Sequence, residues 1–430
     1  MSRVRVAYYG DDFTGSVDVL LQFARRGWTG RLFAGLPAPG LLEQAARDVD
    51  VVGIAGIARS LTTEELEAEV RPALEALRAL RPAVVQYKAC STADSSPTIG
   101  SLGRVIEIAR DVVGEQPVPL LFAQPDFGRY TLFGHHFARE GDTVHRLDRQ
   151  PTMSTHPSTP MTESDLAAHL SRQTTLPIGH IPFTEYTSVD AVACAVRESP
   201  DAALVLDAAD DGHLEMIGAA LTALSGDEPL FALGSGGLSY ALAGASPGSS
   251  APLPRSTAGH GPVLAVSGSR SARTRAQMDA AVEAGWFVAP MPLDPRARDD
   301  AVGRASAELR SGRSVAFSSD DAEVSALAPG DVLSALADTA ADLIGRIART
   351  GAVRRAIVCG GDTSSRVTTL LGVDSLSIAA NPTGNVVLLE AHAADPAIDG
   401  LELLLKGGQV GDVDLFEGIR TLGDEGTSDA

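Results

Sequence analysis

The chain has 430 residues with a formal net charge of −20 at pH 7, and 44% of its residues are hydrophobic and 21% charged. This length exceeds one ordinary hydrophobic core and favours two domains, while the composition excludes a largely disordered chain. The negative charge argues against general binding of nucleic acid or anionic membranes, so an anionic ligand would need local cations and backbone N–H groups.

Short apolar runs alternate with helical segments rich in Ala, Leu and Arg. The runs are continuous rather than alternating, which indicates strands buried on both faces, as in parallel sheets with crossover helices. The expected strands are 4–9, 51–57, 83–87, 119–123, 203–206, 230–233, 263–266, 314–317, 356–359, 386–389 and 401–405. The expected helices include 16–26, 63–80, 100–113, 273–284 and 333–349. The pattern predicts an α/β protein.

A segment rich in Ala, Gly, Pro and Ser, residues 243–262, interrupts this alternation. Such a segment has little to bury and is typical of a linker or surface crossover. We therefore expect two domains, each with a mostly parallel sheet flanked by helices. Their expected bounds are 1–245 and 262–421, with a linker at 246–261 and a flexible tail at 422–430.

The cysteines and the start of the sequence bear on location. Cys90, Cys194 and Cys359 form neither a metal-binding spacing nor a disulfide framework, and are interpreted as free thiols. The sequence runs directly into a strand, without an apolar leader or an apolar run of membrane-spanning length. These features predict a soluble cytoplasmic protein.

Two adjacent carboxylates, Asp11 and Asp12, follow the first expected strand. In open α/β sheets, ligands bind at the carboxyl ends of strands, which makes this position a candidate site. One Asp can cap the helix that follows, but two exceed what capping needs. We predict a functional role for at least one of them.

Residues 88–96 (KACSTADSS) follow the strand 83–87 and form a second candidate. A cation, a carboxylate and a cluster of hydroxyls suit a small polyhydroxy acid, although a Ser/Thr-rich turn is the alternative interpretation. The predicted ligands of such an acid are Asp11, Lys88, Ser91, Thr92, Asp94, Ser95 and Ser96.

Residues 124–161 contain few apolar residues and are expected to form a long loop, which in compact domains is often functional. Arg129, Arg146 and Arg149 are its candidate cations for a carboxylate, with ordinary salt bridges as the alternative. His135 and His136 lack the spacing of a metal site, so hydrogen bonding or surface exposure is expected for both.

Three strand ends in the second domain are rich in Gly and Ser: 266–269, 360–364 and 406–411. Small residues let backbone N–H groups approach an anion, and a helix N-terminus favours negative charge. A nucleotide-phosphate cradle is the leading interpretation, although such turns occur at many strand–helix junctions. The sequence has no P-loop motif, and residues 234–237 have the wrong spacing for a dinucleotide fingerprint.

These segments together resemble the four-carbon acid sugar kinase family, which phosphorylates sugar acids such as threonate, erythronate and 3-oxo-tetronates with ATP. The resemblance covers nearly the whole chain, and its markers are residues 10–15 (GDDFTG), 87–96 (YKACSTADSS), 156–161 (HPSTPM) and 360–363 (GGDT). Residues 146–154 (RLDRQPTMS) look most like the branch that acts on 3-oxo-isoapionate. The exact acid stays open.

The resemblance implies an N-terminal acid-sugar domain, with His156 among the acid ligands, and a C-terminal nucleotide domain. It implies ATP contacts by Ser267, Gly360, Gly361, Asp362, Thr363 and Gly408, and the strand-end pattern adds Gly268, Ser269 and Gly407. The expected reaction is phosphorylation of a terminal hydroxyl, with ATP and Mg²⁺ as cofactors and no dedicated protein metal site.

A hydroxyl needs a group that accepts its proton, and Asp11, Asp12, Asp94 and Asp362 all follow expected strands. Asp362 better suits a metal-water or ribose contact and Asp94 an orienting role, so Asp12, nearest the helix start, is the predicted base. The alternative function is a non-catalytic sugar-acid sensor with a regulatory nucleotide site. A homo-oligomer is compatible with the sequence.

Overall fold

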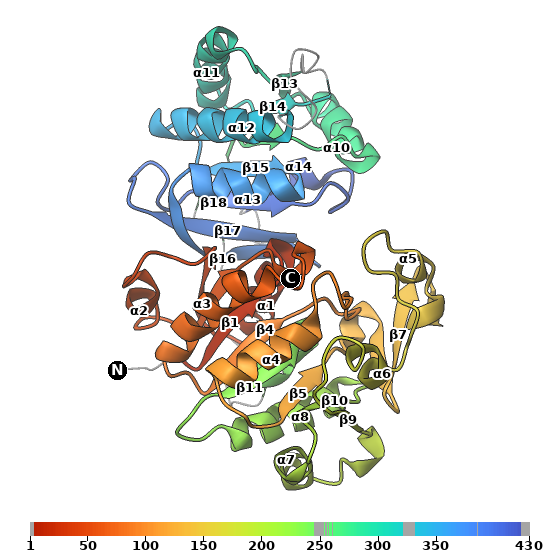
Figure 1. Ribbon diagram of the computed structural model, residues 1–430. Helices are drawn as coiled ribbons and strands as arrows, with labels where there is room; N and C mark the ends of the chain where they lie inside the picture. Colours follow the sequence, from red (N-terminus) through yellow and green to blue (C-terminus); the bar gives the residue numbers. More distant parts are fainter. Residues whose placement is uncertain are drawn as a thin grey trace, which may run out of the picture. The chain divides into compact units, whose positions relative to one another are not determined.

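The computed structural model describes residues 4–244, 261–320, 332–384 and 386–422, and a few single residues between 253 and 259 (Figure 1). The chain divides into two compact units, an N-terminal unit of residues 1–252 and a C-terminal unit of residues 253–430. Both are α/β units with mostly parallel sheets, which confirms the predicted fold class. The expected linker and tail lie almost wholly outside the described residues.

The N-terminal unit is built on a sheet whose strands are all parallel. In spatial order these strands are β2 (Gly30–Ala34), β3 (Val51–Ala55), β1 (Val6–Gly10), β4 (Val84–Lys88), β11 (Leu230–Gly234), β5 (Val118–Leu121), β10 (Ala203–Leu206) and β9 (Ile178–Ile181). The central strands β1, β3, β4 and β11 are buried along their whole length, as expected of strands covered on both faces.

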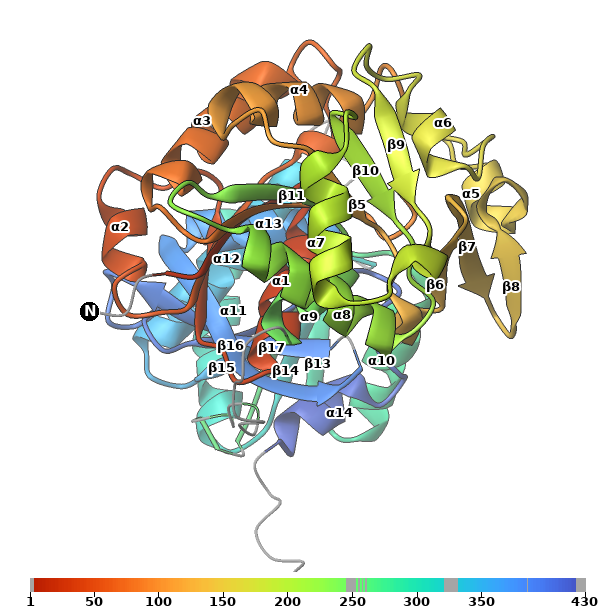
Figure 2. The same ribbon diagram turned by 90° about the horizontal axis from the view of Figure 1, so that it is seen from below.

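Helices cover both faces of this sheet. The described helices of the unit are α1 (Phe13–Ala24), α2 (Leu41–Ala45), α3 (Leu66–Ala79), α4 (Leu102–Val112), α5 (Pro151–Ser154), α6 (Leu166–Leu170), α7 (Val189–Glu198), α8 (Asp211–Leu224) and α9 (Gly236–Gly244). In Figure 2, α3 and α4 lie on one side of the sheet, and α1, α8 and α9 lie on the other. Helix α3 turns Leu66, Val70, Leu74 and Leu77 inward at helical spacing, so that its apolar stripe packs against the strands.

The expectation of a long loop at 124–161 was wrong. Part of this stretch forms a separate antiparallel sheet of β6 (Arg129–Leu132), β7 (His135–Glu140) and β8 (Thr143–Arg146), visible at one side of Figure 2. Phe133 and Gly134 take positive φ values of 52° and 79° between β6 and β7, which suits a tight hairpin turn. The buried carboxylate of Asp207, after β10, accepts hydrogen bonds from both of these backbone N–H groups and fixes the turn to the main sheet.

The sheet of the C-terminal unit is parallel except at one side. In spatial order its strands are β13 (Phe287–Pro290), β14 (Val315–Ser318), β12 (Leu264–Ser267), β15 (Arg355–Cys359), β18 (Glu402–Lys406), β17 (Val386–Ala393) and β16 (Val373–Thr383). Strands β16, β17 and β18 pair antiparallel. The helices of this unit are α10 (Ala272–Glu283), α11 (Pro295–Arg310), α12 (Val332–Arg349), α13 (Gly361–Leu370) and α14 (Leu415–Arg420).

Both units begin with the same strand arrangement. In each, the first strand lies between the third and the fourth, giving the orders β2-β3-β1-β4 and β13-β14-β12-β15. The chain leaves the first strand toward one side of the sheet and leaves the fourth toward the other. The carboxyl ends of these two strands therefore flank a topological switch point, where ligands of α/β proteins bind.

Candidate functional site

The switch point of the N-terminal unit brings together the first two sequence candidates. Gly10 and Lys88 are paired across β1 and β4, and the Asp11 N–H donates to the Lys88 carbonyl at 3.0 Å. The two segments that follow these strands, 11–15 and 88–96, therefore start side by side. Asp11, Asp12 and Lys88 were predicted from segments about eighty residues apart, and the sheet makes them neighbours.

An arginine that sequence reasoning missed holds both carboxylates. Arg59 follows β3, the other neighbour of β1, in a short 3₁₀ turn η1 (Ala58–Ser60). Its Nη2 and Nε donate to the two carboxylate oxygens of Asp11 at 2.6 and 3.2 Å, and its Nη1 donates to Asp12 Oδ2 at 2.7 Å. Burial raises the pKa of Asp11, and the Arg59 guanidinium opposes that rise.

Asp12 also caps helix α1, because its Oδ1 accepts the Gly15 N–H at 2.7 Å. The start of this helix lies against Lys88, whose side chain is 4% exposed. A Cβ added to Gly15 would lie 2.9 Å from Lys88 Nζ and 2.5 Å from Asp12 Oδ1, so a side chain here would displace both charged groups. Two cations and two carboxylates thus gather at one helix N-terminus.

Asp94 and His156 are also brought together. The Thr159 hydroxyl donates to Asp94 Oδ1 and lies 2.8 Å from His156 Nδ1, and His156 Nδ1 is 3.9 Å from Asp94 Oδ1. The Thr159 N–H donates to His156 Nδ1 at 3.1 Å. The 156–161 segment is thereby tied to the segment that follows β4.

The hydroxyls of the 91–96 segment differ in whether they already have hydrogen-bond partners within the protein. Ser95 is buried, donates to the Ala93 carbonyl, and contacts His169 Nε2 and Gln173 Nε2 at 3.0 and 2.9 Å. Ser96 shapes a turn with Thr98 and Ile99. The buried hydroxyl of Thr92 contacts the Cys90 sulfur at 3.0 Å. Within the described residues, the Ser91 hydroxyl has no hydrogen-bond partner.

The two histidines for which hydrogen bonding or surface exposure was expected, His135 and His136, both contact hydrogen-bonding groups. His136 is fully buried, contacting the Ser91 carbonyl through Nε2 at 2.8 Å and Thr131 Oγ1 through Nδ1 at 2.9 Å. Burial lowers the pKa of His136 to about 3, so the ring is neutral. His135 contacts Ser164 Oγ at 2.9 Å. Across the described ranges, no three His, Cys, Asp or Glu residues cluster as a metal site.

The three predicted arginines have different partners. Arg146 makes a bidentate pair with Asp148, both N–O distances being 2.6 Å. Arg149 is exposed, and the described residues offer it no ion pair. Arg129 donates through Nη1 to the carbonyls of Phe127 and Arg139 at 3.0 Å, while its buried Nε has no partner in the described part of the chain.

In the C-terminal unit, the three predicted glycine-rich ends follow neighbouring strands, β12, β15 and β18. The Gly268 N–H donates to the Cys359 carbonyl at 2.9 Å, and the Gly360 N–H donates to the Lys406 carbonyl at 2.8 Å. The sheet thus places the predicted nucleotide contacts in one row: Ser267, Gly268, Ser269, Gly360, Gly361, Thr363, Gly407 and Gly408. The side chain of Asp362 lies outside the described residues.

Close packing explains several of these glycines. A Cβ on Gly268 would lie 2.4 Å from Thr363 Oγ1, and one on Gly408 would lie 2.6 Å from Ser269 Oγ. Gly360 has a φ of 123° and starts α13 without a side-chain cap. The first N–H groups of a helix have no intrahelical acceptor and favour an anion.

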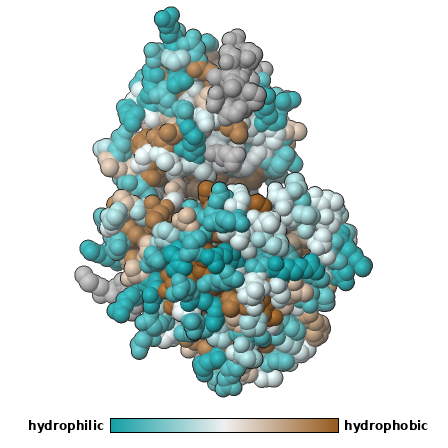
Figure 3. Space-filling model, in the orientation of Figure 1, coloured by the Kyte–Doolittle hydropathy of each residue, from teal (hydrophilic) through white to brown (hydrophobic). Residues whose placement is uncertain are grey.

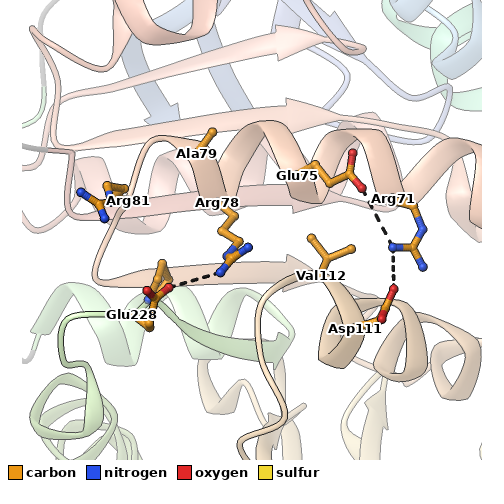
Figure 4. A pocket seen from close by; sticks show the side chains of 9 residues that line it. Arg71, Glu75, Arg78, Ala79, Arg81, Asp111, Val112 and Glu228 are labelled. Carbon is orange, nitrogen blue, oxygen red and sulfur yellow. Dashed lines mark hydrogen bonds and ion pairs between the residues drawn. The ribbon is translucent and has the colours of Figure 1, made fainter.

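A pocket elsewhere in the N-terminal unit does not belong to this site. It has a volume of about 520 Å³ and is lined by residues of α3, α4 and the segment before β11 (Figure 4). Ion pairs occupy it, including Arg71 with Asp111 at 2.7 Å and Arg78 with Glu228 at 3.4 Å. Pro229 precedes β11, so the pocket lies at the amino ends of the strands. In Figure 3 the surface over these helices is mostly hydrophilic.

Comparisons with known proteins match both units. Residues 6–242 match the family model described as a sugar-binding N-terminal domain, and residues 264–416 match that of a nucleotide-binding C-terminal domain. The 3-oxo-isoapionate kinase of Paraburkholderia graminis is 37% identical, with 96% of this chain and 94% of that protein covered. The 3-oxo-tetronate kinase of Pseudomonas fluorescens is 32% identical, with 94% of both covered. The D-threonate kinase of Bordetella bronchiseptica is 28% identical, with 96% and 95% covered.

Solved structures share the fold. A Haemophilus influenzae protein matches with a TM-score of 0.79 at 23% identity, covering 97% of this chain and 100% of that one. A Salmonella typhimurium protein described as a putative tRNA synthase matches with a TM-score of 0.79 at 24% identity, covering 97% and 99%. Among the described helices, none has the length and apolar character needed to cross a membrane.

From the matches along both units, the chain belongs to the four-carbon acid sugar kinase family.

Proposed function

We propose that this protein uses ATP to phosphorylate the terminal hydroxyl of a small oxidised sugar acid of the 3-oxo-isoapionate or 3-oxo-tetronate type. The named activities of relatives that are 37% and 32% identical over nearly their full lengths support this substrate class. The observation that carries the proposal is the Arg59-bridged pair of Asp11 and Asp12 at the β1–β4 switch point. Such a concentration of charge has little value in a core and suits a polar ligand.

We assign the acid's carboxylate to Arg129. Its Nη1 is fixed by backbone carbonyls, whereas Nε has no partner and no acidic residue of the described ranges pairs with its guanidinium. Nε and Nη2 form the edge that receives a carboxylate side-on, which is the edge that Arg59 presents to Asp11 and Arg146 to Asp148.

Two further observations support this assignment. Burial lowers the pKa of Arg129, the direction expected of a cation that lacks a compensating charge. The strand that begins at Arg129, β6, also pairs with β7, whose His136 contacts the Ser91 carbonyl at 2.8 Å, so β6 is linked to the segment that follows β4. Burial of Nε means that the side chain has to shift as a carboxylate docks on this edge.

In the proposed reaction, the substrate hydroxyl oxygen forms a bond to the γ-phosphorus of ATP as the bond from that phosphorus to ADP breaks. The hydroxyl proton passes to Asp12, whose side chain is 32% exposed, whereas that of Asp11 is 2% exposed. Arg59 keeps Asp12 oriented through Oδ2. Asp11 serves mainly as the buried partner of Arg59.

The row of strand ends in the C-terminal unit is the proposed nucleotide site. Its glycines let backbone N–H groups approach phosphates, and the start of α13 adds further donors. Mg²⁺ offsets phosphate charge when bound, and it retains several waters and needs few protein ligands. We also propose a cytoplasmic role in carbohydrate-acid catabolism, in line with the sugar-acid kinase activities named for its relatives.

The test is a coupled assay for ADP release over a panel of tetronates, 3-oxo-tetronates and branched 3-oxo acids. We expect turnover with one 3-oxo acid and little turnover with acids lacking the oxo group. The rival function is a non-catalytic sensor. Tight binding of ATP and an acid without ADP release on any panel member would favour the sensor and refute the kinase.

A further inference from the structure

Lys406, the last residue of β18, is a buried cation without an acidic partner. It is 2% exposed, and its Nζ donates to Thr274 Oγ1 at 3.2 Å. Its other neighbour is the Cys359 thiol, which stays neutral because burial raises the pKa of Cys359 to about 11. No carboxylate of the described residues pairs with Lys406. Burial accordingly lowers the pKa of Lys406.

Strands β15 and β18, which end in Cys359 and Lys406, carry a second buried cation at their amino ends, and this one is paired. Arg355 and Glu402 are paired across β15 and β18 at their amino ends, and are 2% and 0% exposed. Their side chains form an ion pair at 2.8 Å. At the carboxyl ends, the corresponding cross-strand pair is Cys359 and Lys406. The buried cation at the amino ends of these strands therefore has a carboxylate partner, and the buried cation at their carboxyl ends has none among the described residues.

The glycine-rich segments follow the carboxyl ends of the strands, where Lys406 lies. Thr274 Oγ1, which accepts from Lys406, itself donates to the Gly408 carbonyl at 2.9 Å, and the Ser271 hydroxyl donates to the same oxygen. Gln277 Nε2 donates to the Val410, Gly411 and Asp412 carbonyls. The segment after β18 is thereby fixed to helix α10, with the Lys406 ammonium at its base.

We propose that Lys406 supplies the fixed positive charge of the nucleotide site and positions the Gly407–Gly408 segment, its compensating charge being the phosphates of the bound nucleotide. This rests on the proposed function, since it deepens the role of the same site. An isolated buried ammonium is costly in the free protein. Phosphates held by Gly268, Gly360 and Gly408 would remove that cost, so binding and burial are linked.

The test is Lys406→Met, which keeps the length of the side chain and removes its charge. In the full-length protein without ligand, we expect a melting temperature at or above that of the wild type, because an uncompensated buried charge is lost. The dissociation constant for ATP–Mg²⁺, measured by calorimetry, should rise about 10- to 100-fold, the scale of losing one nearby charge in a partly buried site. Binding of the sugar acid should be unchanged.

Arg355→Met is the matched control. It removes the other buried cation of these strands and leaves the buried Glu402 carboxylate without the Arg355 charge, so the melting temperature should fall while ATP affinity is kept. Lys406→Met should therefore weaken ATP binding without lowering the melting temperature, and Arg355→Met should lower the melting temperature without weakening ATP binding. A Lys406→Met protein that melts lower than the wild type but binds ATP equally well would show a purely structural lysine and overturn the proposal.

A second variant covers the case in which Lys406→Met does not fold. Thr274→Val removes the hydroxyl between Lys406 and Gly408 and should weaken ATP binding at least about threefold, the scale of one hydrogen bond. Unchanged affinity there would also overturn the proposal. A wild-type protein that binds no ATP refutes the nucleotide site as a whole, whereas equal binding by wild type and Lys406→Met refutes only the role of Lys406.

Discussion

One guanidinium holds two neighbouring carboxylates that would otherwise repel each other. Arg59 binds Asp11 side-on and Asp12 through its remaining nitrogen. The two carboxylates differ in solvent access, since the side chain of Asp11 is 2% exposed and that of Asp12 is 32% exposed. This difference supports the proposed roles, in which Asp11 is the buried counter-charge of Arg59 and Asp12 is the accessible proton acceptor.

Asp12→Asn tests the proposed base. Asparagine caps a helix about as well as aspartate, so α1 should be retained and stability little changed. The turnover number should fall roughly 10²–10⁴-fold, the usual scale for losing a general base, with both Michaelis constants nearly unchanged. Asp165, which caps α6 through the same kind of bond, provides the control, and Asp165→Asn should leave turnover normal. Near-normal turnover of Asp12→Asn would move the role to another group.

Arg59→Met tests the buried ion pair. Near neutral pH the free energy of unfolding should fall by about 3–5 kcal/mol, because Asp11 is left buried without a partner. Burial already raises the pKa of Asp11 above its ordinary 3.8, and losing Arg59 raises it further. The folded variant then binds a proton that the unfolded chain does not, so its stability falls as pH rises from about 4 through that raised pKa.

The loss caused by Arg59→Met should therefore be smaller at pH 5 than at pH 7.5 in urea unfolding. Arg71 provides the control, because the side chains of its partners Glu67 and Asp111 are 36% and 67% exposed, against 2% for Asp11. Arg71→Met should change stability little at either pH. A pH-independent loss in Arg59→Met would contradict the ionised state that we assign to Asp11 in the pair.

Arg129→Met tests the assigned carboxylate site. The Michaelis constant for the acid should rise about 10- to 100-fold, the scale of losing a charge-assisted bidentate contact, while that for ATP stays constant. Arg149→Met removes an exposed arginine of the same region and should leave both constants unchanged. Equal effects on both substrates would point to a folding defect and remove the support for this assignment.

The residues that sequence reasoning identified at this site were those in conspicuous local patterns. Asp11, Asp12 and Lys88 end recognisable strands. Arg59 lies 48 residues from Asp11 in a segment with no such pattern, and only the pairing of β1 with β3 makes them neighbours. Ser95 was predicted as a ligand because it lies among hydroxyls, whereas its contacts with His169 and Gln173, which are 74 and 78 residues away, appear only in the fold.

At the scale of secondary structure, the glycine-rich turns differ in what they tolerate. A side chain on Gly268 or Gly360 would meet Thr363, and Gly360 also has a φ of 123°, so we expect substitutions at either position to disturb the local packing. Gly361 starts α13, and a Cβ on it would meet nothing within 4 Å. Its open space lies at the helix N-terminus, where we propose that phosphates bind.

Gly361→Val is therefore the selective test of the nucleotide cradle. We expect a folded protein with a large rise in the Michaelis constant for ATP, because the new side chain occupies space needed by phosphate. Gly303, in the exposed face of α11, also has open space around it, and Gly303→Val should change neither constant. Unchanged nucleotide affinity in folded Gly361→Val would count decisively against this placement.

The strands that the sequence predicted and those that it missed differ in burial. Continuous apolar runs identified β1, β3, β4 and β11, which are buried throughout. Strands β2, β9 and β13 were missed because they lie at or near the ends of the spatial orders given above and expose part of their residues. Strand β16 was missed because it mixes Asp, Ser and Asn with its apolar residues. A search for apolar runs finds only strands covered on both faces.

At the scale of the whole molecule, the two units share one arrangement of their first four strands, which no repeat in the sequence indicated. Each unit places its candidate residues at the same topological position, after its first and fourth strands. With a net charge of −20, each also needs its own cations to hold an anion. Lys88 and Arg59 lie at one switch point, and Lys406 lies beside the other.

Hydrogen exchange measured with each ligand alone tests the proposal that the C-terminal unit binds the nucleotide and the N-terminal unit binds the sugar acid. Bound ligands protect the backbone amides that they contact or order. ATP–Mg²⁺ should slow exchange most at 267–271, 360–364 and 407–411, because those backbone groups form the proposed phosphate cradle. The sugar acid should slow exchange most at 11–15, 88–96 and around Arg129. Because Gly361 belongs to the C-terminal unit and Gly361→Val should block the proposed cradle, this variant should lose the first pattern and keep the second. Protection of 88–96 by ATP alone, with no change at 360–364, would reverse the assignment of the two sites.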